Sequence, residues 1–186
     1  YANMAAALRE NPTLDELAAD YAAIYLNNSF GASPYESVWL SDEHLACDRS
    51  MFELREIYAA AGWRVGDWRR RFDDHLVLQL QYLRRVLVSA AVDPEKLASF
   101  IDEHIGYWLP DWGQRVSSYC GTGFYAALAE LTHVWLRRFR ELLGEIHDLP
   151  LPSRERMGEK INRKLALDKA EIAPVRFMPG VQGPSW

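Results

Sequence analysis

The chain has 186 residues, a length that suits one domain with a buried core. Apolar residues make up 49% of it, which excludes a disordered chain, and 12% of the residues are aromatic, including 7 tryptophans. The net charge of −5, from 21 basic and 26 acidic residues, argues against a nucleic-acid-binding protein that neutralises phosphates.

The first clear helix signal is a capping-box pattern. Thr13 and Glu16 have its spacing, and apolar residues continue at helical spacing until Asn27. Residues 31–46 carry glycine, proline and serine, and they predict a loop rather than a strand. A second helix is predicted over about 48–61, and the polar, basic stretch after it predicts a solvated loop.

A third helix is predicted over about 74–91, with Asp73 or Asp74 as its N-cap and an apolar stripe along one face. The sequence Asp-Pro-Glu at 93–95 marks the start of the next helix, because it supplies an N-cap residue, a proline in the first turn and an acidic side chain. We expect that helix to end before Pro110.

The last long helix is predicted over about 124–143, between a Gly-Thr-Gly turn at 121–123 and Gly144. The charged segment 154–169 predicts one further helix, and residues 174–186, rich in proline and glycine, predict an extended tail. The sequence shows no repeat, alternating strand pattern or domain-scale linker. We therefore expect an all-α fold in which the whole chain forms a single-domain helical bundle.

The two cysteines indicate the cellular compartment. Cys47 and Cys120 lie far apart and form no CxxC motif, so they predict buried free thiols in a reducing environment. No apolar run approaches the ~18 residues of a membrane span, and no secretory signal pattern opens the sequence. We therefore expect a cytoplasmic protein.

One metal-ligand pattern occurs. Glu130 and His133 have the Glu-x-x-His spacing of di-iron bundles, but no other histidine repeats it and no CxxC or HxxxH pair occurs. A surface pair is the favoured interpretation, and we expect no cofactor. A small helical metalloprotein or enzyme that uses Glu130 and His133 remains the alternative function.

Two motifs remain without a settled role. The stretch 34–40, Pro-Tyr-Glu-Ser-Val-Trp-Leu, places two large aromatic side chains in a predicted loop, where they either dock on the core or line a binding surface. Asp74 and His75 open a helix, either as ordinary capping residues or as an exposed pair beside an apolar groove. The residues alone leave both alternatives open.

Together, in this order and at this separation, the two motifs resemble the TorD/DmsD/NarJ family of molybdoenzyme maturation chaperones. The resemblance covers roughly residues 14–143 and also rests on Phe124-Tyr125 with the leucines that follow. This sequence departs from the family pattern at Asp73, where many members have Pro or Glu. The resemblance also implies that the family's first helix or helices are missing from this sequence. It also implies a protein that is not an enzyme and that can exchange helices in a swapped dimer, with a hinge near 93 or at 109–113.

The resemblance implies a cytoplasmic chaperone that binds the twin-arginine signal peptide and the apo form of a molybdopterin oxidoreductase, and that assists cofactor insertion and folding before export. Peptide binding falls on the two motifs, and we expect a further tryptophan to help wall an apolar groove. These residues are Tyr35, Ser37, Trp39, Asp74, His75 and Trp108. A purely structural helical adaptor is a third hypothesis, which failure to bind any leader peptide would favour.

Overall fold

The computed structural model describes residues 2–26, 31–41, 44–67, 69–89 and 92–171, with side chains up to residue 166. The chain divides into two compact units, residues 1–152 and 153–186. The second unit contains the described helix α9 (Arg154–Glu171), where the charged segment predicts a helix. The single-domain arrangement stays a prediction, and the predicted tail lies outside the described residues.

The first unit begins with two short helices. α1 (Ala2–Arg9) is rich in alanine, which has the highest helix propensity, although the sequence analysis did not predict this helix. α2 (Leu14–Tyr21) starts at the predicted capping box: Thr13 Oγ1 accepts a hydrogen bond from the Glu16 backbone, and Glu16 accepts one from the Thr13 backbone. It continues as a π-helical segment, η1 (Ala22–Leu26). The predicted stop at Asn27 lies outside the described residues.

A short helix, α3 (Glu36–Leu40), occupies part of the stretch that we predicted to be a loop. Five residues are too few for an independently stable helix, so contacts with other elements must stabilise it. The next helix, α4 (Arg49–Ala60), confirms the predicted second helix. Gly62 follows its C-cap with a left-handed φ of 68°, a conformation that glycine adopts without strain.

The third predicted helix is confirmed as α5 (Leu76–Leu87), but its N-cap is His75 rather than Asp73 or Asp74. The Nδ1 atom of His75 accepts a hydrogen bond from the backbone N–H of Val77 at 3.1 Å. α6 (Pro94–Phe100) starts at its predicted aspartate cap and then becomes π-helical in η2 (Ile101–Gly106).

Two helices end the first unit. The preceding helix ends before Pro110, as predicted, because η2 ends at Gly106. Pro110 itself lies in the first turn of α7 (Leu109–Tyr119), a helix that was not predicted, where no hydrogen bond needs its missing N–H. The suggested hinge at 109–113 is therefore helical. α8 (Gly123–His147) extends beyond its predicted ends, and Gly144 lies inside it. Its C-cap is Asp148, which adopts a left-handed φ of 55°.

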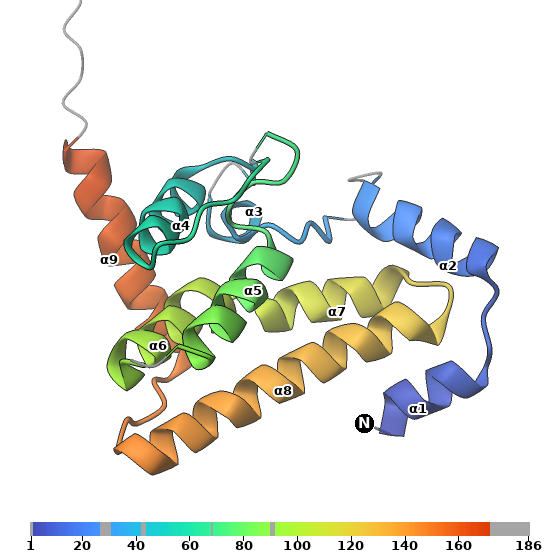
Figure 1. The fold of residues 1–186 in the computed structure, drawn as a ribbon. Coiled ribbons are helices and arrows are strands. Elements are labelled where there is room, and N and C mark those ends of the chain that lie inside the picture. The colour runs from blue at the N-terminus through green and yellow to red at the C-terminus, as the bar shows by residue number, and fades with distance from the viewer. Residues whose placement is uncertain (1, 27–30, 42–43, 68, 90–91, 172–186) are drawn as a thin grey trace, which may run out of the picture. The chain divides into compact units, whose positions relative to one another are not determined.

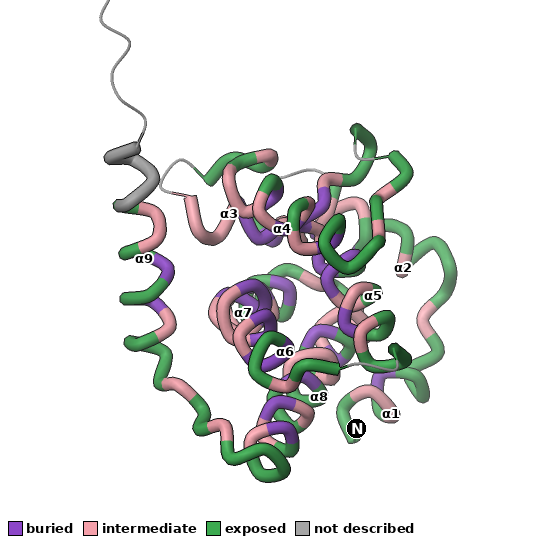
Figure 2. Tube along the Cα trace, turned by 60° about the vertical axis from the view of Figure 1, so that its left-hand side comes forward, coloured by how far each residue is buried: buried purple, intermediate pink, exposed green. Residues whose placement is uncertain are grey.

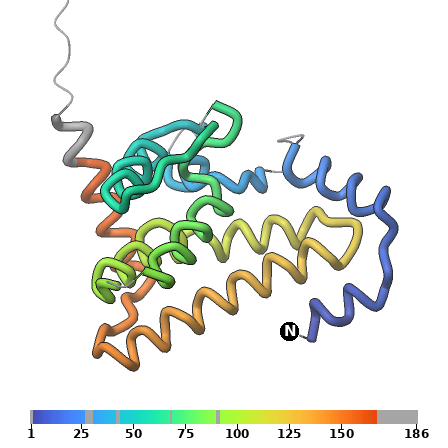
Figure 3. Tube along the Cα trace, viewed as in Figure 1, coloured from blue at the N-terminus to red at the C-terminus, as the bar shows by residue number. Residues whose placement is uncertain are grey.

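Within the first unit, α8 is the main scaffold. It packs against α1, α2, α6, η2 and α7, and Figure 1 shows α7 and α8 lying side by side. Figure 2 marks buried positions along α7 and α8, and Figure 3 follows the chain from α1 and α2 to α3–α6. Trp108, Ile105 and Leu109 of this core are at most 1% exposed.

The described residues form helices and a single isolated β-bridge, between Tyr35 and His75, so the all-α prediction is confirmed. The cysteine prediction is correct for free thiols but wrong about their burial, because Cys47 and Cys120 are only half-buried.

Candidate functional site

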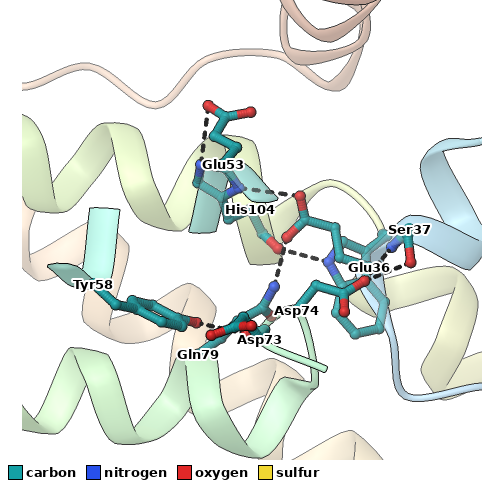
Figure 4. A network of polar contacts seen from close by, with 9 residues as sticks. Glu36, Ser37, Glu53, Tyr58, Asp73, Asp74, Gln79 and His104 are labelled. Atoms are coloured by element: carbon teal, nitrogen blue, oxygen red, sulfur yellow. Dashed lines mark hydrogen bonds and ion pairs between the residues drawn. The ribbon is translucent and has the colours of Figure 1, made fainter. Parts of the chain in front are cut away.

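The stretch 34–40 and the start of α5 are tied together by hydrogen bonds (Figure 4). Asp74 is fully buried, and its Oδ2 atom accepts hydrogen bonds from the backbone N–H of Ser37 at 2.9 Å and from the Ser37 hydroxyl at 2.5 Å. The backbone adds two further bonds, from Glu36 to the Asp74 carbonyl and from Leu76 to the Pro34 carbonyl. Asp74 therefore supplies the long-range contact that stabilises α3.

A second buried carboxyl group, Glu36, extends this network toward η2. Its Oε2 atom accepts a hydrogen bond from Gln79 Nε2 at 2.5 Å, and its Oε1 atom lies 3.0 Å from His104 Nδ1. The other ring nitrogen of His104 lies 3.8 Å from Glu53 Oε1, whose side chain is 25% exposed. Burial raises the pKa of Glu36 to about 7, although the nearby His104 opposes that rise. A continuous polar path thus leads from the core to the surface at Glu53.

Burial also raises the pKa of Asp74, while its bonds from Ser37 oppose that rise. Among the described residues, Asp74 Oδ1 and Gln79 Oε1 are buried side-chain oxygens without a hydrogen-bond partner. A proton on Asp74 would convert one of these unsatisfied acceptors into a donor. The neighbouring Asp73 has a separate role, because its carboxylate pairs with Arg55 at 2.7 Å and holds the turn before α5 against α4.

The aromatic residues of the motif are only partly accessible. Tyr35 is half-buried beside the His75 ring, with ring centroids 4.9 Å apart. Trp39 is also half-buried, and it stacks on Trp108 with centroids 6.3 Å apart. Trp108 itself is 1% exposed and donates from Nε1 to the His104 carbonyl, which makes it a core residue.

The structure thus brings the six predicted peptide-binding residues into one region, but they differ in accessibility. Ser37, Asp74 and Trp108 are buried, whereas Tyr35, Trp39 and His75 are half-buried. The exposed acidic group that we expected at Asp74 is not found, because its carboxylate serves α3. The direct peptide-binding role of the six residues stays a prediction.

A groove that the sequence analysis missed lies at the outer end of this polar path. It has a volume of about 1020 Å³ and is lined by residues of α4, α5, α6 and η2, including Glu53 and His104. One signal of it was available in the sequence: Tyr82 stands at i, i+4 spacing from Val86 and widens the apolar stripe of α5. An apolar stripe wider than one packing face indicates a second surface to cover.

The alternative metal site gains no support from the described residues. Glu130 and His133 line a smaller groove of about 420 Å³ between α1, α7 and α8, and Glu130 accepts a hydrogen bond from Asn3 at 2.6 Å. Across the described ranges, no group of three or more His, Cys, Asp or Glu residues could hold a metal ion. No described helix is long and apolar enough to cross a membrane.

Comparison with known families gives the class of the protein. Residues 1–113 match the family model described as the nitrate reductase delta subunit, and the chain belongs to this family. The resemblance inferred from the two motifs is therefore confirmed.

Individual relatives carry the name "Chaperone protein TorD". The relative from Shewanella sp. (strain MR-4) is 32% identical over 144 residues, which cover 74% of this chain and 68% of the relative. The relative from Shewanella oneidensis is 33% identical, covering 74% of this chain and 65% of its own length. The chain spans 64% of the Vibrio cholerae O395 relative, which is 28% identical over 70% of this chain. No solved structure matches.

Proposed function

We propose that this chain is a chaperone for the maturation of a molybdoenzyme and is not itself an enzyme. The observation that carries the proposal is the family match, because residues 1–113 contain both the 34–40 motif and the Asp74-His75 pair. Relatives of similar sequence are named chaperones, which supports the same class.

The proposed ligand is the twin-arginine leader of an apo molybdopterin oxidoreductase. Such a leader combines a basic segment with a short apolar segment, which aggregates or directs premature export if it is left uncovered. The net charge of −5 suits a basic ligand. The chaperone holds the apo-enzyme in the cytoplasm until its molybdenum cofactor is inserted, and then releases it for export.

The accessibility of the motif residues separates those that contact the client from those that position them. Tyr35, Trp39 and His75 keep part of their side chains at the surface and contact the client. Asp74 and Ser37 position this surface from below through their hydrogen bonds.

Copurification tests the proposal. The full chain is co-expressed with a tagged molybdopterin oxidoreductase subunit from the same genome, once with its leader and once without it. We expect the chain to copurify with the cofactor-free subunit, and in a smaller amount when the leader is deleted. Equal recovery from both subunits would contradict leader binding, and no recovery from either would contradict the chaperone function.

A further inference from the structure

The groove between α4, α5, α6 and η2 has an apolar floor. Its lining includes Ile57 from α4, Tyr82 and Val86 from α5, and Leu97 and Phe100 from α6. Leu97 and Phe100 are buried, while the other three are half-buried and still offer apolar surface. The volume of about 1020 Å³ is at the upper end of the range for small-molecule pockets, so the groove has room for several apolar side chains.

One end of the groove is acidic. Glu53 and Glu103 both line it there, beside His104, whose Nε2 atom lies 3.8 Å from Glu53 Oε1. Glu103 accepts a hydrogen bond from the Ser99 hydroxyl, which fixes its direction. Glu103 lies in the π-helical segment η2, and π-helical turns occur frequently at functional sites, whereas Glu53 lies on α4. Two carboxylates that line one groove suit guanidinium groups.

The opposite end carries positive charge. Arg85, near the end of α5, and Lys96, in the first turns of α6, both line the groove there. Lys96 pairs with Asp93 at 3.2 Å, so Arg85 leaves this end with a net positive charge. Lys96 and Glu103 mark the two ends along α6 and η2, and at ~1.5 Å per helical residue their seven-residue separation is about 10 Å.

We infer that this groove holds the apolar segment of the client leader as a helix, with the leader arginines at Glu53 and Glu103. The inference rests on the proposed function and adds a binding site for it. A helix about 10 Å long contains about 7 residues, which is the lower end of the range for the apolar segment of an export leader. The partial negative charge at the C-terminus of such a helix then faces Arg85 and Lys96. The charge polarity thus favours one orientation of the leader, and the apolar length is compatible with it.

Two neighbouring alanines of α4 provide a matched test. Ala59 and Ala60 are both exposed, but only Ala60 lines the groove. A dye-labelled synthetic peptide with two arginines and an apolar run is titrated with the full chain, and anisotropy reports binding. We expect Ala60→Trp to weaken binding about tenfold or more by filling the groove, and Ala59→Trp to change it less than about twofold. Circular dichroism checks that both variants fold.

A charge test uses the same peptide. The double variant Glu53→Gln, Glu103→Gln should weaken the arginine peptide about fivefold or more and leave a peptide with glutamines at those positions unaffected. Glu56→Gln, on an exposed position of α4 outside the groove, is the control. If the wild-type chain binds the peptide and Ala60→Trp binds it equally well, the groove is not the binding site and the proposed function stands. If the wild-type chain binds neither this peptide nor a native leader, both fail.

Discussion

The bonds between Asp74 and Ser37 predict a specific loss of stability. Asp74→Ala removes the acceptor of two hydrogen bonds to a buried carboxylate, at 2.9 and 2.5 Å. A hydrogen bond to a charged group contributes about 1.5–3 kcal/mol, and relief of the desolvation that raises the pKa of Asp74 offsets part of the loss. We expect the free energy of unfolding to fall by about 3 kcal/mol in Asp74→Ala and by about 1.5 kcal/mol in Ser37→Ala, which keeps the backbone bond.

Urea unfolding followed by circular dichroism at pH 7 measures these losses. The double variant should lose about 1–2 kcal/mol less than the sum of the two single losses, because both changes remove the same bond. Asp74→Asn keeps an oxygen acceptor and should lose about 1 kcal/mol or less. A loss below about 0.5 kcal/mol in Asp74→Ala, or strictly additive losses, would refute the idea that this carboxylate holds α3.

Three further predictions concern the rest of the first unit. Burial, helped by Arg71, lowers the pKa of His75 to about 4. Between pH 4 and 6.5 the folded state therefore binds fewer protons than the unfolded state. The free energy of unfolding should fall as the pH drops through that window. With a discount for partial exposure, wild type should lose about 1–2 kcal/mol more than His75→Asn between pH 7 and 4.5 in urea titrations; equal losses would contradict this. Gly144→Ala should lower stability by about 1–3 kcal/mol, because the added Cβ would lie 2.6 Å from the Leu149 carbonyl oxygen. Gly113→Ala, whose added Cβ would have its nearest contact at 3.9 Å, should be neutral or stabilising. Thermal melts that rank the two variants the other way would contradict this prediction. Light scattering should find a monomer with a minor helix-swapped dimer, and a larger oligomer independent of concentration would refute this.

Local capping chemistry explains why much of the fold was predictable. The Thr13–Glu16 box and the aspartate before Pro94 act over three residues, so the sequence shows them directly. By contrast, α3 depends on Asp74, 37 residues away from Ser37, and local propensity cannot reveal that contact. The preceding helix does end before Pro110, at Gly106, but proline is also compatible with the first turn of a new helix, and α7 was missed because this second possibility was not considered.

The candidate site was predictable in its members but not in their accessibility. An aspartate at a helix start has the same sequence signature whether it faces solvent or a buried serine, so the burial of Asp74 required the tertiary structure. The groove was missed because its charged residues come from different helices. Glu53 on α4 and Glu103 in η2 line the same groove although 50 residues separate them in the sequence.

Titration of an isolated leader into the full chain tests the central claim most directly. A synthetic twin-arginine leader from a molybdopterin oxidoreductase of the same genome is added in a calorimeter, with a scrambled peptide of equal composition as the control. We predict binding at one site with a dissociation constant of about 1–10 μM, because the ordering of the peptide offsets much of the gain from apolar burial. The same weak signal from leader and scrambled peptide, up to about 1 mM, would contradict the account.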